Sequence, residues 1–222
     1  MSQLSELFSV WITTRAGGLT SYLLLFVSTA AGLLMSGKLS GRKSQAAILA
    51  VHQWAGWFGF LFGLMHGMVL LFDRYVGYSA VELAVPFASD DHRWLNGIGT
   101  LSLYISAILI ASSDLMKRLG RRLWRAIHFL AFAGYGMALA HGILLGTDTR
   151  NAGIAAMYAA TGLIVVGLLV YRIYSAMKKP LASPSPSKGG KADRPPRDYG
   201  DGRTVAIEYI PPAETNRIRL EK

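Results

Sequence analysis

The residues of this chain that could carry chemistry are four histidines in two matched pairs. His52 and His66 lie on one apolar stretch, and His128 and His141 lie on another. Histidine is costly in hydrocarbon, so a histidine inside a membrane segment marks a functional site by default. The first pair is fourteen positions apart and the second thirteen, which corresponds to ~21 Å and ~19.5 Å along a helix. Because one metal ion cannot bridge such distances, each histidine needs a partner on another helix.

Helix parity predicts how these histidines pair. The two stretches are separated by two crossings of the membrane, so they run in the same direction. His52 is therefore expected level with His128, and His66 level with His141. Two bis-histidine sites at two depths suit two b-type haems, because haem iron takes one imidazole from each side.

In an ideal helix, the two histidines of the second pair would point in different directions around the helix axis. Thirteen steps leave His141 ~140° around the helix from His128. We therefore expect a kink or twist in this helix, or two haems rotated relative to each other. Gly134 and Gly136 lie between the histidines; they could permit the deviation, make room for a flat macrocycle, or allow close helix packing.

One other function competes for these four histidines, and a separate function is open to the fifth. A haem-independent proton pathway would use intermediate carboxylates, and the central portions of the apolar stretches contain none. The fifth histidine, His92, lies beside Asp90 and Asp91 in a polar loop, where we expect it to be solvated. The alternative is that this patch holds a metal substrate such as ferric iron.

The elements that must position the histidines are membrane helices. The chain has 222 residues, of which 52% are hydrophobic and 16% charged, a composition that suits a small integral membrane protein. Crossing ~30 Å of hydrocarbon takes ~20 residues. Stretches near this length cover 17–36, 46–72, 94–113, 124–146 and 152–177. We expect an all-α integral membrane protein, a bundle of about five transmembrane helices, since the alternating segments of a barrel are absent.

The basic residues predict the orientation. The net charge is +10, but the cations gather in alternate connections and the tail, which indicates membrane topology rather than nucleic-acid binding. They are Lys38, Arg42, Lys43, Lys117, Arg118, Arg121, Arg122, Arg125, Lys178 and Lys179. We expect a multi-pass protein of the inner (plasma) membrane with its N-terminus outside and its C-terminus in the cytoplasm. Pairing with haem propionates is an alternative role for Arg15, Lys38, Arg42, Arg122 and Arg125.

Composition predicts three segments along the chain. Residues 1–16 have apolar side chains at helical spacing and form a short interfacial segment; residues 17–177 form the membrane domain. Residues 178–222 are rich in Pro, Ser, Lys and Gly and form a disordered cytoplasmic tail. A signal peptide around 15–30 is the alternative start, but its cleavage would leave the first basic loop outside. The chain has no cysteine, which excludes disulfides and iron–sulfur ligation.

The histidine spacing resembles the ferric reductase-like transmembrane domain shared by NADPH oxidases, ferric-chelate reductases and stand-alone bacterial relatives. The strong part is the pair H-x13-H followed two helices later by H-x12-H. Weaker parts are Leu119-Gly-Arg-Arg-Leu-Trp-Arg-Ala-Ile-His128, Arg15-Ala-Gly-Gly-Leu and Val85-Pro-Phe-Ala-Ser89. The resemblance covers roughly residues 14–175. It implies that His52, His66, His128 and His141 ligate two haem b and that the domain passes electrons across the bilayer.

The resemblance also bears on the electron partners. The oxidases carry a fused flavin and nicotinamide domain and usually one more helix before the first one here, whereas this sequence has no G-x-G-x-x-G. We therefore expect a separate flavoprotein dehydrogenase or a quinol as donor, and an acceptor on the outer side. The alternative is a dedicated electron-carrier subunit, like the haem membrane subunit that feeds the bacterial periplasmic methionine-sulfoxide reductase.

Overall fold

The computed structural model describes residues 10–37, 41, 43–73 and 77–178. The chain divides into two units, Met1–Lys179 and Pro180–Lys222, and the fold described here is that of the first. The regular elements of the described residues are helices: α2 (Val10–Ser36), α3 (Gln45–Leu70), α4 (Ala80–Ala84), α5 (Arg93–Asp114), α6 (Met116–Leu119), α7 (Arg121–His128), α8 (Leu130–Leu145), the 3₁₀ turn η1 (Thr147–Arg150) and α9 (Ala152–Met177).

Five spans within the described residues are long and apolar enough to cross a membrane. They are Val10–Ser36, Gln45–Leu70, Arg93–Asp114, Arg121–Leu145 and Ala152–Met177. The prediction of an all-α integral membrane protein with about five transmembrane helices is therefore confirmed. The predicted tail, apart from Lys178, lies outside the described residues.

The first and fourth spans differ in detail from the sequence-based expectation. Helix α2 begins at Val10 and continues without a break into the first span, so residues 10–16 are part of one long helix; residues 1–9 lie outside the described range. The fourth span is divided at Phe129 into α7 and α8. The expected irregularity of this span is thus next to His128 and not at the glycines between its two histidines.

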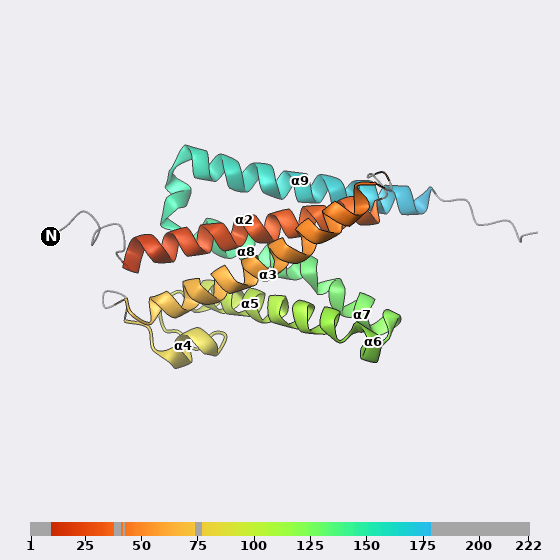
Figure 1. Cartoon of the computed structure of the whole chain (residues 1–222). Coiled ribbons are helices and arrows are strands. Elements are labelled where there is room, and N and C mark those ends of the chain that lie inside the picture. Colours follow the sequence, from red (N-terminus) through yellow and green to blue (C-terminus); the bar gives the residue numbers. More distant parts are fainter. Residues whose placement is uncertain (1–9, 38–40, 42, 74–76, 179–222) are drawn as a thin grey trace, which may run out of the picture. The chain divides into compact units, whose positions relative to one another are not determined.

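The long helices lie side by side, with shorter elements at both ends of the bundle (Figure 1). One end carries the residues 77–92 with α4, and the turn η1; we call it the loop end. The other end carries α6 and α7, whose exposed side chains include five lysines and arginines between 117 and 125; we call it the basic end.

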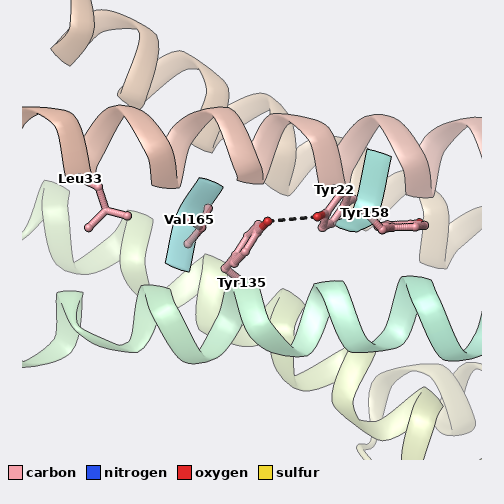
Figure 2. Close-up of a cluster of buried hydrophobic side chains, with 5 residues drawn as sticks. All are labelled: Tyr22, Leu33, Tyr135, Tyr158 and Val165. Atoms are coloured by element: carbon pink, nitrogen blue, oxygen red, sulfur yellow. Dashed lines mark hydrogen bonds between the residues drawn. The ribbon is translucent and has the colours of Figure 1, made fainter. Parts of the chain in front are cut away.

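A cluster of tyrosines joins three of the long helices (Figure 2). The hydroxyl of Tyr22 on α2 lies 3.0 Å from that of Tyr135 on α8 and 2.5 Å from that of Thr161 on α9. The ring of Tyr158 on α9 packs against Tyr22 at 4.8 Å between centroids. Since all four residues are buried, their hydroxyl groups can find partners only among themselves and the nearby backbone.

Close packing of α5 against α8 depends on Gly134. The hydroxyl of Ser102 donates to the Gly134 carbonyl at 2.9 Å, and a Cβ at Gly134 would lie 2.9 Å from Cγ2 of Ile105. A larger residue would therefore push the two helices apart. Of the roles considered for Gly134 from the sequence, the structure shows close helix packing.

Candidate cofactor site

The structure brings the four intramembrane histidines together as two facing pairs. The rings of His52 and His128 have centroids 5.9 Å apart with planes inclined at 66°. Those of His66 and His141 are 6.3 Å apart and inclined at 81°. We call them the basic-end pair and the loop-end pair. They are the pairs that helix parity predicts, and ligation of haem by them is still a prediction at this point.

The separation within each pair leaves room for one metal ion between the rings. Two imidazoles that bind a metal from opposite sides through bonds of ~2.0–2.1 Å have ring centroids about 6 Å apart, since each centroid lies about 1 Å beyond its nitrogen. Both observed separations have this value. An N–H···N hydrogen bond of ordinary length, about 2.9 Å, would bring the two centroids closer, to about 5 Å.

Three of the four rings are held by the backbone of a neighbouring helix. In each case Nδ1 donates to a carbonyl oxygen at 2.8 Å: His52 to Ser28, His66 to Thr14, and His141 to Leu95. An imidazole that donates through Nδ1 keeps its lone pair on Nε2. This arrangement fixes the tautomer and the ring orientation that a metal-ligating histidine requires.

A glycine four residues after each of these carbonyls makes room for the ring. A Cβ would lie 2.9 Å from Nδ1 of His66 at Gly18, 3.3 Å from Nδ1 of His52 at Gly32, and 2.7 Å from Nδ1 of His141 at Gly99. In a helix, the N–H of residue i+4 bonds to the carbonyl of residue i, so the glycine lies directly beside the accepting oxygen. We call each carbonyl with its glycine a carbonyl seat.

The carbonyl seats explain why α2 packs beside α3, the helix that carries His52 and His66. Helix α2 supplies both seats for the histidines of α3, and their spacing of fourteen residues, Gly18 to Gly32, equals that of His66 and His52. Because the helices are antiparallel, equal spacings keep both contacts in register. Ser28 adds a second link at the basic end, since its hydroxyl donates to the His52 carbonyl at 2.9 Å.

His128 differs from the other three histidines. Its Nδ1 is buried and has no hydrogen-bond partner within the described structure. The ring instead stacks on the indole of Trp124, with centroids 4.9 Å apart and planes inclined at 29°. His128 is also the last residue of the short helix α7, whereas His52 lies within the continuous helix α3.

A cavity of about 460 Å³ reaches from the loop residues past the loop-end pair to Leu25, Gly59 and Ser106. This volume is in the range of small-molecule and cofactor sites. His66 and His141 line this cavity together with Gly18, Gly67 and Gly99. No atom lies within 4 Å of a Cβ placed at Gly67. The imidazole pair, the absence of side chains at these glycines and the open space fit a flat metal cofactor.

Polar residues surround the loop end of this cavity. Arg15, which lies above the Trp11 ring at 3.9 Å, forms an ion pair with Asp148 and also donates from Nε to that carboxylate at 2.6 Å. Hydrogen bonds from the backbone N–H and hydroxyl of Ser79 lower the pKa of Glu82. The cavity therefore meets the aqueous side between charged groups of both signs.

His92 belongs to neither facing pair, although it lines the same cavity as His66 and His141. It lies at the start of α5 with φ of 43°, and its Nε2 is 3.7 Å from the Asp91 carboxylate. Over the described ranges, no three or more acidic or histidine side chains are grouped so that they could hold a metal ion. The described residues therefore give no support to the alternative of a metal-substrate site at His92.

Sequence reasoning found the histidines and missed the residues that hold them. The matching signal for α2 was present in the sequence, because Gly18 and Gly32 repeat the fourteen-residue spacing of His52 and His66. No comparable spacing indicates Trp124, whose role depends on the end of α7 at His128.

Comparison with known proteins gives a match to one family. The model of the ferric reductase like transmembrane component matches residues 16–139 of the 222-residue chain. The matched range includes three of the four histidines and ends two residues before His141. No curated protein and no solved structure matches the chain.

Proposed function

The chain belongs to the ferric reductase-like transmembrane component family, and from this premise we propose that it carries electrons across a membrane through two b-type haems. Domains of this family generally bind haem. We assign one haem to His52 and His128 and the other to His66 and His141. The observation that carries this proposal is the pair of facing rings, 5.9 and 6.3 Å apart.

The residues of the chain have definite roles in this proposal. The four imidazoles act as axial ligands, and the carbonyl seats of Thr14, Ser28 and Leu95 hold three of them in one tautomer. A bound b haem supplies one-electron chemistry, and its potential is set by the ligands, their hydrogen bonds and the low-dielectric surroundings. The backbone hydrogen bonds also limit ring rotation, which a proton relay through the same histidines would need.

We place the electron donor at the basic end and the acceptor at the loop end. A separate flavoprotein dehydrogenase or a quinol would reduce the basic-end haem on the cytoplasmic side. The cavity that connects His66 and His141 to the loop residues favours a small acceptor, such as a ferric chelate, with direct access to the loop-end haem. A dedicated partner reductase is the alternative acceptor.

Single histidine substitutions test the ligand assignment. We expect about two b haems per chain in the wild type, from the two bis-histidine sites. His52→Ala and His128→Ala should each remove the same haem, and His66→Ala and His141→Ala the other. The measurement is the reduced-minus-oxidised absorbance spectrum with haem and protein quantified. His92→Ala is the control, because this exposed loop histidine belongs to neither pair.

Three results would count against the proposal. A folded wild-type protein without haem, made with ample haem supply, would overturn the cofactor. Loss of one common haem by His52→Ala and His66→Ala would overturn the pairing. If an added partner reductase oxidises the reduced protein and ferric chelates do not, direct reduction of chelates would be overturned in favour of the carrier alternative.

A further inference from the structure

The register of α5 and α8 shows where a carbonyl seat for His128 would be. Two hydrogen bonds fix this antiparallel register: His141 Nδ1 to the Leu95 carbonyl, and Ser102 to the Gly134 carbonyl. Continued along α5, the same register places His128 opposite Ile108, one residue before Leu109. By analogy with the other seats, the glycine would then lie four residues later, at position 112.

A serine occupies position 112 and a second serine follows at 113, and both bond to the carbonyl of Leu109, next to the register position. The hydroxyls of Ser112 and Ser113 donate to the Leu109 carbonyl at 3.0 and 2.8 Å. A carbonyl oxygen accepts about two hydrogen bonds through its lone pairs. The Leu109 oxygen therefore has no capacity left for an imidazole, which agrees with the unpartnered Nδ1 of His128.

Ser113 instead connects α5 to the ring through Trp124. The indole Nε1 donates to the Ser113 hydroxyl at 3.3 Å, and the face of the indole stacks on the His128 ring at 4.9 Å and 29°. Trp124 is half-buried and lies one helical turn before His128 on α7, a spacing that brings side chains into contact. The Nε1 edge of the indole and its face are thus both in contact with a neighbouring residue.

We propose that Trp124, anchored on Ser113, is the positioning residue that holds the imidazole plane of His128 in the basic-end pair. This inference rests on the proposed haem ligation. Helix α5 then positions both histidines of the fourth span, one directly through the Leu95 carbonyl and the other through an indole. Because a stacked ring lacks the hydrogen bond that a carbonyl seat supplies, His128 is the axial ligand held most weakly.

The test compares Trp124→Leu with the wild type by two spectroscopic measurements. The electron paramagnetic resonance spectrum of the oxidised protein depends on the angle between the two imidazole planes at each haem. We expect the basic-end signal to shift or broaden in Trp124→Leu and the loop-end signal to stay unchanged. The signals are assigned with the single histidine variants described above.

Carbon monoxide provides the second measurement. It binds reduced haem only where an axial imidazole leaves, so that an iron–nitrogen bond is exchanged for an iron–carbon bond and no electron is transferred. We expect carbon monoxide to change the spectrum of one haem per chain in Trp124→Leu and of none in the wild type. Trp124→Phe keeps an aromatic face without Nε1 and should show a smaller signal shift without carbon monoxide binding.

Trp54→Leu is the matched control. This indole lies two residues after His52, is 65% exposed and stacks on Phe58 at 5.8 Å between centroids. Its loss therefore removes the same volume near the basic-end pair, from a ring that stacks on a phenylalanine and not on a histidine. Wild-type spectra for both haems in Trp124→Leu would overturn the positioning role while leaving two haems per chain intact. If Trp124→Leu does not accumulate, unchanged spectra in both Trp124→Phe and Ser113→Ala would overturn it equally.

Discussion

Gly99 lies so close to the ring of His141 that a Cβ at this position would come within 2.7 Å of Nδ1. The Leu95 carbonyl that holds this ring lies on the same face of α5. A methyl group at Gly99 would therefore displace the imidazole from its acceptor. Each of these imidazole rings can reach its carbonyl acceptor because no side chain lies beside that carbonyl.

We expect Gly99→Ala to lose the loop-end haem and keep the basic-end haem. Alanine stabilises a helix relative to glycine by roughly 0.5–1 kcal/mol, so weakening of α5 itself cannot explain such a loss. Haem per chain, measured from the reduced-minus-oxidised spectrum, should fall by about half if each bis-histidine site holds one haem.

Gly136→Ala is the control for this substitution. Gly136 lies on α8 between the two histidines and is exposed, and unlike Gly67 it is not among the residues that line the cavity. No atom of another helix is within 4 Å of a Cβ placed there. Its haem content should equal that of the wild type. Equal haem in Gly99→Ala and the wild type would show that the ring does not need the carbonyl seat.

Three helices meet at the hydroxyl of Tyr22, and this contact bears on how the helices pack together. Tyr22 on α2 is 4% exposed and lies within hydrogen-bond distance of Tyr135 on α8 and Thr161 on α9. Thr161 also lies outside the range that matches the family. The cluster therefore joins α9 to the helices that carry and position the histidines.

We expect Tyr22→Phe to lower the free energy of unfolding by about 0.6–2 kcal/mol, the range for hydrogen bonds between membrane helices. The removed hydroxyl leaves two buried groups with one partner fewer, which adds to the loss. Unfolding with sodium dodecyl sulfate in mixed micelles measures the change. Tyr171→Phe, which removes a hydroxyl from a 43% exposed side chain on α9, should unfold like the wild type; equal losses in both variants would refute a specific role for Tyr22.

The elements differ in how far the sequence predicts them. The spans follow from apolar length, and the level of each histidine follows from helix direction, so both could be predicted. The division of the fourth span at Phe129 could not, because no proline or glycine is at that position and Gly134 and Gly136 were the plausible break points. The break follows the short helix α7, which contacts α5, and local propensity does not indicate it.

Across the molecule, the two histidine pairs are separated along the helix axis by most of the thickness of the hydrocarbon layer. Fourteen residues of α3 separate His52 from His66, or ~21 Å of a hydrocarbon layer ~30 Å thick. A hydrocarbon layer centred on the two pairs would leave each pair about 4–5 Å from one interface. This placement suits transfer of electrons from one aqueous side to the other, and its direction depends on which end faces the cytoplasm.

Charge predicts that the basic end is cytoplasmic. That end exposes Lys117, Arg118, Arg121, Arg122 and Arg125, whereas the connection at the loop end contains Glu82, Asp90 and Asp91. Because the chain has no cysteine, one introduced cysteine gives an unambiguous label. We expect a membrane-impermeant maleimide to label Asp90→Cys in intact cells, or in spheroplasts if an outer membrane blocks the reagent.

Arg121→Cys is the matched position at the other end and should react only after the membrane is permeabilised. Both positions are exposed in the structure, so a difference in labelling reports the side of the membrane and not burial. The reverse pattern would place the loop-end cavity and the loop-end pair on the cytoplasmic side of the membrane. Electrons from a cytoplasmic donor would then enter at His66 and His141, and the acceptor would have to meet the basic end, where His128 stacks on Trp124.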